Sequence, residues 1–328
     1  MLAASLTPAL SRREREQAVV RAGALKRRNA LLLAAAAALR SAYAHAAHDM
    51  QEVAPGIWVR RGVHEEATAA NQDGIANIGF IIGRDAAAVL DPGGSLADGQ
   101  GLRAALRART DLPVRYVVMT HLHPDHVFGA AAFVDDSPVF VGHARMAGML
   151  VQRGEFYRNA LADVLGIEAA GDYAKPGLLV QDTATLDLGG RVLQVRAHPT
   201  AHTDNDLSIL DAQTGTLWLG DLLFVDRVPA LDGSILGWLA ATGALRAAPA
   251  RLAVPGHGPA SVPWPDAAAA QERYLGGLVR DIRAMIRRGG DIETAVAEAG
   301  QAERGNWLLF DDYNGRNVTM AFKELEWE

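Results

Sequence analysis

The stretch Tyr116-Val-Val-Met-Thr-His121-Leu-His-Pro-Asp-His126 joins an apolar run to three imidazoles and a carboxylate. The apolar part predicts a buried strand. His121 and His123 are two residues apart, so an extended backbone points both imidazoles to one side. Pro124 then turns the chain, and Asp125 and His126 follow directly. Imidazole and carboxylate together suit Zn²⁺ or another borderline divalent ion, so this pattern predicts a metal-binding loop after a strand.

Composition excludes several classes of protein. The 328-residue chain is 49% hydrophobic, which is enough for a packed core, and it has no cysteine. Disulfides, cysteine-ligated zinc, iron–sulfur clusters and a cysteine nucleophile are therefore excluded. Residues 1–46 carry eight Lys or Arg and two Glu in a chain of net charge −6, so the remainder is acidic. An acidic body argues against nucleic acid as a partner.

The N-terminal region has the pattern of an export signal. Basic residues at 26–28 precede an apolar stretch of about ten residues, which is too short to span a bilayer. Cleavage sites of small residues follow at Ala42 and Ala44, or at Ala44 and Ala46. We expect export to the periplasm by the Sec or twin-arginine route, with no stable membrane anchor. The alternative is a basic amphipathic helix of a cytosolic protein.

The rest of the chain alternates between strand and helix patterns. We expect an export segment over 1–46 and a single domain over 47–328 with a C-terminal helical extension. Strand, helix and strand over 86–119 indicate a βαβ unit, with a site at the C-terminal ends of its strands. Strands are expected at 57–61, 75–82, 86–90, 114–119, 138–141, 178–188, 191–197, 207–210 and 216–219. Helices are expected at 96–109, 129–133, 144–165 with a break at Gly154, 234–246, 267–288, 292–299 and 318–326.

Three more candidate ligands, His202, Asp221 and His257, each follow an apolar run and a sharp turn. We expect each to lie on a loop at a strand end, held by a rigid sheet. Taken singly, Asp221 or His257 could be an ordinary turn residue. His202 competes with His198, and we favour His202 because the threonine after it could orient the ring. Together with the loop at 121–126, these residues predict two metal-ligand sets.

The order of these motifs resembles the metallo-β-lactamase superfamily over roughly residues 53–260. The resemblance implies an α/β fold, an αβ/βα four-layer sandwich with two mixed sheets inside and helices outside. It implies two Zn²⁺ per chain, bridged by Asp221, with Asp125 also orienting the hydroxide and passing its proton on. Asp91 matches the aspartate that ends an early strand and supports the site. The implied ligands are His121, His123 and His202 for one zinc, and Asp125, His126 and His257 for the other.

Further stretches are similar to a periplasmic group, the quinoprotein relay system zinc metallohydrolases. These stretches are residues 75–83, 121–129, 201–207, 229–238 and 324–328. The similarity implies a link to components of pyrroloquinoline quinone-dependent dehydrogenase systems. It predicts a binuclear zinc hydrolase whose bridging hydroxide attacks the carbonyl of a small ester, thioester, lactone or lactam. The alternatives are a metal-binding accessory protein with little turnover and a redox protein with a di-iron centre.

The surroundings of the site give weaker expectations. No cluster of Lys or Arg stands beside the motifs, which argues against a phosphate substrate. Loops 65–74, 145–176 and 224–238 are expected to shape the pocket. The last region offers either an apolar wall or ordinary packing from Leu223, Phe224, Val225, Leu231 and Trp238. Candidates to hold the ligand imidazoles are Asp91, Asp204 and Asp206.

Overall fold

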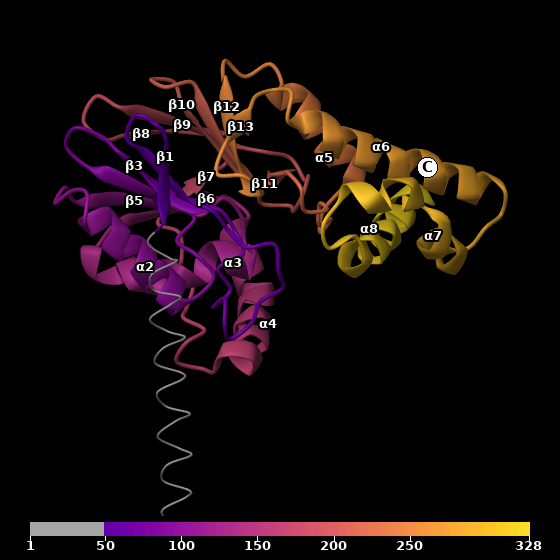
Figure 1. Ribbon diagram of the computed structural model, residues 1–328, viewed down its shortest axis with the longest axis horizontal. Coiled ribbons are helices and arrows are strands. Elements are labelled where there is room, and N and C mark those ends of the chain that lie inside the picture. Colours follow the sequence, from indigo (N-terminus) through magenta and orange to yellow (C-terminus); the bar gives the residue numbers. More distant parts are fainter. Residues whose placement is uncertain (1–48) are drawn as a thin grey trace, which may run out of the picture. The chain divides into compact units, whose positions relative to one another are not determined.

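The computed structural model describes residues 49–328, which contain two mixed β-sheets and the helices around them (Figure 1). The export segment expected over residues 1–46 lies outside the described residues. Its cleavage sites lie outside them too.

The first sheet follows chain order. Its strands β1 to β4 pair antiparallel, and β4 to β7 pair parallel. Helix α2 (Leu96–Arg107) connects β4 to β5, which confirms the expected βαβ unit. It begins at Ser95, whose hydroxyl accepts a hydrogen bond from the backbone N–H of Asp98. The strands are β1 (Met50–Ala54), β2 (Ile57–Arg60), β3 (Ile78–Ile82), β4 (Ala87–Leu90), β5 (Val114–Val118), β6 (Val139–His143) and β7 (Leu178–Val180).

The second sheet has the order β13-β12-β11-β10-β9-β8. Only the β11–β12 pair is parallel, and its register is irregular around Gly220. The strands are β8 (Thr183–Asp187), β9 (Val192–Ala197), β10 (Leu207–Asp211), β11 (Thr216–Phe224), β12 (Leu252–His257) and β13 (Val262–Pro263).

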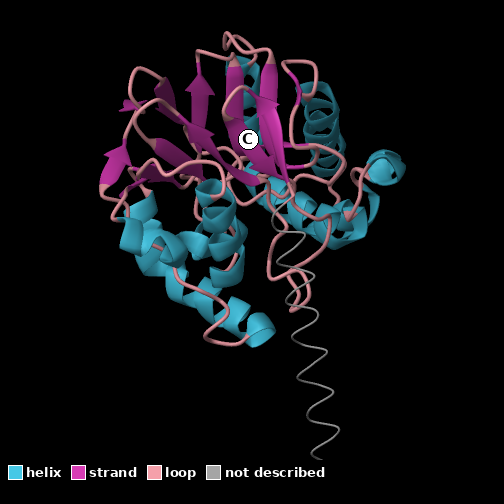
Figure 2. Cartoon of the chain, turned by 60° about the vertical axis from the view of Figure 1, so that its left-hand side comes forward, coloured by secondary structure: helices cyan, strands magenta, loops and turns pink. Residues whose placement is uncertain are grey.

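Helices lie on the outer sides of both sheets (Figure 2). Beside α2, the first sheet has α3 (Pro124–Val127), the 3₁₀ helix η1 (Phe128–Asp136) and α4 (Met146–Leu165). The second sheet has α5 (Ile235–Leu245), α6 (Ala268–Arg287), α7 (Ile292–Glu298), the 3₁₀ helix η2 (Gln301–Asn306) and α8 (Phe310–Leu325).

Three apolar layers hold this arrangement together. Leu90 of the first sheet packs with Trp218 of the second between the two sheets. On the outer face of the first sheet, Phe80 packs with Leu102 of α2. On the outer face of the second, α5, α6 and α8 share a core that includes Tyr274. Burial on both faces of both sheets confirms the expected αβ/βα sandwich.

Two local expectations were wrong. Residues 178–188 form two strands in different sheets, because β7 pairs with β6 whereas β8 pairs with β9. Helix α4 runs through Gly154 without a break. A Cβ at Gly154 would stand 2.7 Å from the ring of Tyr173, so this glycine permits close packing.

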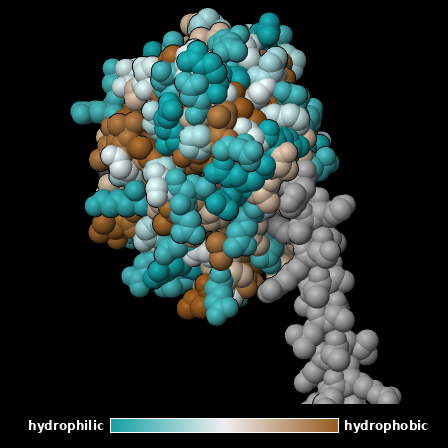
Figure 3. All heavy atoms as spheres, turned by 90° about the vertical axis from the view of Figure 1, so that its left-hand side faces the viewer, coloured by the Kyte–Doolittle hydropathy of each residue, from teal (hydrophilic) through white to brown (hydrophobic). Residues whose placement is uncertain are grey.

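No helix among residues 49–328 is both long and apolar enough to cross a bilayer. On the face shown in Figure 3, hydrophobic side chains form small groups separated by hydrophilic ones.

Candidate metal centre

The seven residues predicted as ligands converge at one end of the two sheets. Each offers one nitrogen or oxygen atom to one of two groups, and within each group these atoms lie within 4.8 Å of one another. Five of the seven side chains are buried, and those of His123 and Asp125 are partly exposed, at 19% and 12%. The first group is His121, His123, His202 and Asp221, and the second is Asp125, His126 and His257.

The first group is drawn together from three segments. His121 and His123 follow β5, and His202 comes from the loop between β9 and β10. The Nδ1 atom of His123 lies 3.1 Å from His121 Nε2 and 3.0 Å from His202 Nε2. Three imidazole nitrogens thus face one point, as a zinc-type site requires.

Asp221 lies between the two groups. Its Oδ2 is 3.4 Å from Nε2 of both His202 and His257, and its Oδ1 is 3.0 Å from His126 Nε2. One carboxylate could therefore serve both groups. The expectation that Asp221 ends its strand was wrong, because β11 continues to Phe224. Gly220, at φ 50°, bends the strand at this point in the left-handed region that favours glycine.

The second group is built from α3 and β12. Pro124 opens the short helix α3, which carries Asp125 and His126. His257 is the last residue of β12. Asp125 Oδ2 lies 3.3 Å from His257 Nε2 and 3.5 Å from His126 Nε2.

The outward nitrogen of each imidazole faces an oxygen acceptor. His126 Nδ1 lies 3.0 Å from Asp91 Oδ2, and His257 Nδ1 lies 3.0 Å from the Ile75 carbonyl. For His202, Nδ1 lies 2.6 Å from the Ala230 carbonyl. His123 Nε2 lies 3.2 Å from Asp232 Oδ2, and His121 Nδ1 lies 3.0 Å from the Thr120 hydroxyl, which donates to Asp91. These acceptors place the proton on the outward nitrogen, so the inward nitrogen has a free lone pair.

Burial and neighbouring charge set the protonation of the site. Burial lowers the pKa of His202 to about 3, so this ring is neutral. Burial raises the pKa of Asp221, but His257 and His126 outweigh it and hold this pKa well below the usual value. Burial lowers the pKa of His126, but Asp221, Asp125 and Asp91 outweigh it and raise this pKa well above the usual value. A bound cation would replace that proton on His126.

The residues fit a divalent cation. His126 Nε2 and Asp221 Oδ1 are buried and lie 3.0 Å apart, but neither forms a hydrogen bond of good geometry within the described chain. Buried polar atoms without partners are costly, and an ion between the two groups would satisfy both. Nitrogen and carboxylate donors suit zinc and similar ions.

Several contacts were not evident in the sequence. Asp232 lies in loop 224–238, and Arg153 of α4 donates to its Oδ2 at 2.6 Å. Arg227 Nη1 lies 3.4 Å from His257 Nδ1. Two arginines therefore stand beside the site although no basic cluster marks the motifs, because separate segments carry them.

Some weaker expectations are now decided. Among Asp91, Asp204 and Asp206, only Asp91 contacts a ligand ring, while Asp206 binds Thr203. His198 is buried beside Ser208, outside both groups. Of the residues of the expected apolar wall, Phe224 stacks on the His257 ring at 4.9 Å and Trp238 packs on the His202 ring at 5.1 Å. Leu223, Val225 and Leu231 belong to the core or pack against it.

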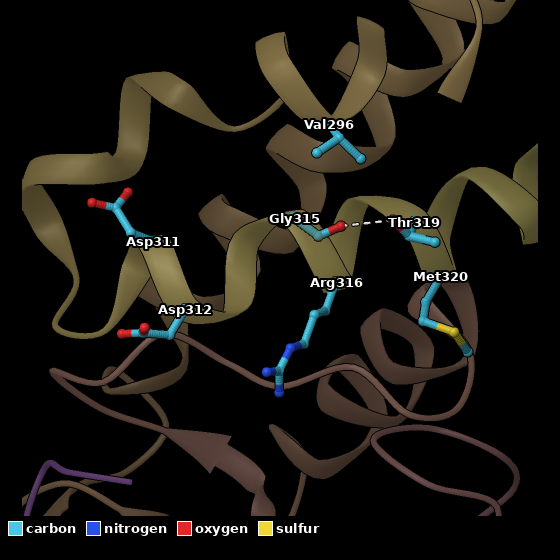
Figure 4. A pocket seen from close by; sticks show the side chains of 7 residues that line it. All are labelled: Val296, Asp311, Asp312, Gly315, Arg316, Thr319 and Met320. Carbon is cyan, nitrogen blue, oxygen red and sulfur yellow. Dashed lines mark hydrogen bonds between the residues drawn. The ribbon is translucent and has the colours of Figure 1, made fainter. Parts of the chain in front are cut away.

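A groove on the surface lies away from the metal centre. It is an open groove of about 460 Å³ between α7 and α8 (Figure 4). Thr319 and Gly315, hydrogen bonded to each other, lie on the outward face of α8 there. None of the seven candidate ligands lines this groove. The lining residues are Val296, Asp311, Asp312, Gly315, Arg316, Thr319 and Met320.

The fold and the two groups correspond to a known family. A model of the metallo-beta-lactamase superfamily matches residues 71–257, more than half of the chain, so the chain belongs to this superfamily. Membership together with the two His/Asp groups indicates a metal-dependent hydrolase.

Individual relatives are more distant. A linear primary-alkylsulfatase of Pseudomonas sp. (strain ATCC 19151) is 36% identical over 58 residues, which are 18% of this chain and 11% of that protein. The match therefore spans about a tenth of the alkylsulfatase.

Solved structures share the fold at low sequence identity. The sec-alkylsulfatase Pisa1 from Pseudomonas sp. has a TM-score of 0.62 at 17% identity, covering 85% of this chain and 50% of its own. A metallo-beta-lactamase from Pontibacter korlensis has a TM-score of 0.56 at 18% identity, covering 70% of this chain and 98% of its own. TMB-1 has a TM-score of 0.55 at 17% sequence identity, and the match covers 70% of this chain and 96% of TMB-1.

Proposed function

We propose that this protein is a hydrolase with two zinc ions, one bound by each group and both bound by Asp221. The observation that supports this most is the orientation of the five imidazoles. Each directs a lone pair inward while its other nitrogen meets an oxygen acceptor. Such acceptors fix ring orientation and raise ligand basicity in metal sites.

The chain's own residues would position the reactants. The bound ions would supply Lewis acidity at the scissile bond and make a bound water more acidic. Asp125 lies at the edge of the second group, with its side chain 12% exposed. It is placed to take a proton from the attacking water and pass it to the leaving group.

We propose an ester, thioester, lactone or lactam of a small molecule as the substrate. A sulfate ester is the second candidate. It is supported by the alkylsulfatase relatives and by the half-exposed Arg153, which stands beside Asp232 and could meet an anionic group. We keep as an alternative a metal-binding accessory protein with little turnover.

The cellular context is also a proposal. Residues 1–46 would direct export to the periplasm. Similarity to the quinoprotein relay system zinc metallohydrolases supports a role beside quinoprotein dehydrogenases. Fusion of residues 1–46 to a reporter that is active only after export tests the first part.

The first prediction concerns Asp221→Ala. Zinc content should fall, because both groups lose an oxygen donor, and hydrolysis should fall to background. The measurements are metal analysis and turnover of aryl ester, thioester, lactone, β-lactam and alkyl sulfate substrates. Asp204→Ala is the matched control, since within the described residues the Asp204 side chain hydrogen bonds to Asn205 and to none of the seven ligands.

The outcomes separate the candidates. Full zinc content and full activity in Asp221→Ala would refute the proposed centre. Two bound zinc ions without turnover of any substrate in the wild type would favour the accessory role.

A further inference from the structure

The loop between β11 and α5, residues 225–234, lies against two imidazoles of the first group. The Ala230 carbonyl accepts from His202 Nδ1 at 2.6 Å, and Asp232 N donates to the His202 carbonyl at 3.0 Å. Asp232 Oδ2 meets His123 Nε2 at 3.2 Å. The loop contains no helix or strand, so contacts outside it must hold these acceptors in place.

The C-terminal segment supplies those contacts along the whole loop. Leu308 N donates to the Asp226 carbonyl at 2.8 Å, and the Leu308 carbonyl accepts from Val228 N at 3.0 Å. At the far end, Glu324 of α8 accepts from the Ser234 hydroxyl at 2.7 Å and from Ile235 N at 2.8 Å.

Asn317 of α8 holds the centre of the loop. Its Oδ1 accepts from Leu231 N at 2.8 Å, and its Nδ2 donates to the Pro229 carbonyl at 2.6 Å. These contacts lie on either side of Ala230. Asn317 is 1% exposed, so its loss would leave both backbone groups buried without partners. The position of the Ala230 carbonyl, and with it the His202 ring, depends on this amide.

The second group is held by other parts of the chain. Asp91 orients His126 and the Ile75 carbonyl orients His257. Neither acceptor is hydrogen bonded to Asn317 or Glu324. Arg227 of the loop lies against His257 and donates to Tyr313 of α8, so α8 also reaches the second group, but through other residues. The two groups therefore differ in their dependence on Asn317 and Glu324.

We propose that Asn317 and Glu324 are positioning residues for the first group, so that α8 sets the affinity of that group for its metal ion. Both residues lie outside the family match at 71–257. The inference rests on the proposed metal centre. It makes the C-terminal helix a part of the site rather than a separate addition.

The second prediction tests this inference with Cd²⁺, followed by calorimetric titration and cadmium NMR. Asn317→Leu should weaken binding at the first group by about tenfold and shift its resonance, while the second group keeps its affinity. Glu324→Gln, a milder change of the same kind, should weaken the first group by a smaller factor. Thr319→Ala is the matched control in the same helix, because its hydroxyl bonds to the Gly315 carbonyl and not to Asn317 or the loop.

Each outcome decides the question. Wild-type binding in both Asn317→Leu and Glu324→Gln would overturn the inference. An equal loss in Thr319→Ala would also overturn it, because general destabilisation of α8 would then explain the effect. If Asn317→Leu does not fold, Glu324→Gln decides alone. If the wild type binds no Cd²⁺ in either group, the metal centre itself is refuted and this inference with it.

Discussion

Asp221 is the residue on which the two groups depend most. Its carboxylate lies close to imidazoles from two loops, from α3 and from β12, yet it sits inside a strand. A carboxylate at this depth needs compensation by positive charge, and the surrounding histidines or an ion between them supply it. The sequence indicated Asp221 as a candidate ligand, because Gly-Asp follows an apolar run. The position of Asp221 between the two groups was evident only in the structure.

His198 gives the third prediction, which concerns stability and pH. Burial first, then Arg196 and His143, lower the pKa of His198 from 6.5 to about 4. Between these two values the unfolded chain binds a proton that the folded chain does not. Stability is therefore complete above pH 6.5 and falls as the pH falls toward 4. His198 should account for about 2 kcal/mol of the loss at about pH 5.

Urea unfolding of metal-free protein near pH 7 and near pH 5 measures this loss. His198→Gln keeps a side chain that can bond to the Ser208 hydroxyl but does not titrate. The variant should lose less free energy of unfolding on acidification than the wild type. An identical loss in both proteins would show that His198 does not carry the effect.

At the scale of elements, the close approach of β11 and β12 is essential to the site. Gly256 of β12 packs directly on Asp221: a Cβ there would overlap Asp221 Oδ1 and stand 2.8 Å from Asp221 N. Strands that carry side chains at this contact could not pair so closely, so the carboxylate would move.

The fourth prediction follows from this contact. Gly256→Ala should cost about 1–3 kcal/mol of stability and lower zinc affinity at both groups, because overpacking displaces Asp221. Gly243→Ala in α5 is the matched control. No atom lies within 4 Å of its added Cβ, and it should stabilise the helix by about 0.5–1 kcal/mol. Thermal unfolding measures the change in stability, and zinc titration measures the change in affinity. Wild-type zinc affinity in Gly256→Ala would contradict the prediction.

Elements also show where periodicity is insufficient. Residues 178–188 have one strand-like pattern, but their two halves pair with different neighbours, β6 and β9. Alternating apolar residues indicate a strand with one buried face, and pairing in either sheet would bury that face. The choice of partner strand comes from the packing of the two sheets.

At the scale of the whole molecule, two buried side chains join the sheets at opposite ends. Near the site, Asn77 Nδ2 donates to the Pro255 carbonyl at 2.9 Å, and Asn77 N donates to the Gly256 carbonyl at 2.7 Å. At the other end, Arg191 pairs with Asp211 at 2.7 Å and donates to the Ile82 carbonyl at 2.9 Å.

The fifth prediction compares these two links. Asn77→Ala should cost about 2–3 kcal/mol, and Arg191→Ala about 3–5 kcal/mol because the buried Asp211 carboxylate loses its positively charged partner. Only Asn77→Ala should also weaken zinc binding at the second group, since the lost amide holds the Pro255 and Gly258 carbonyls on either side of His257. Denaturant unfolding and zinc titration test this. Equal weakening by Arg191→Ala would mean that sheet packing as a whole, and not Asn77, sets the site.

The sequence by itself determined the kind of donor atoms, the order of the motifs along the chain and the two-sheet fold class. These are local properties, because ligand spacing and apolar periodicity each depend on residues within a short stretch of the chain. Only the tertiary structure decided which nitrogen of each imidazole faces inward. The acceptors that settle this, the carbonyls of Ile75 and Ala230 and the carboxylate of Asp232, come from distant segments. A hydrogen bond acts over about 3 Å, so no pattern along the chain could reveal contacts that exist only after folding.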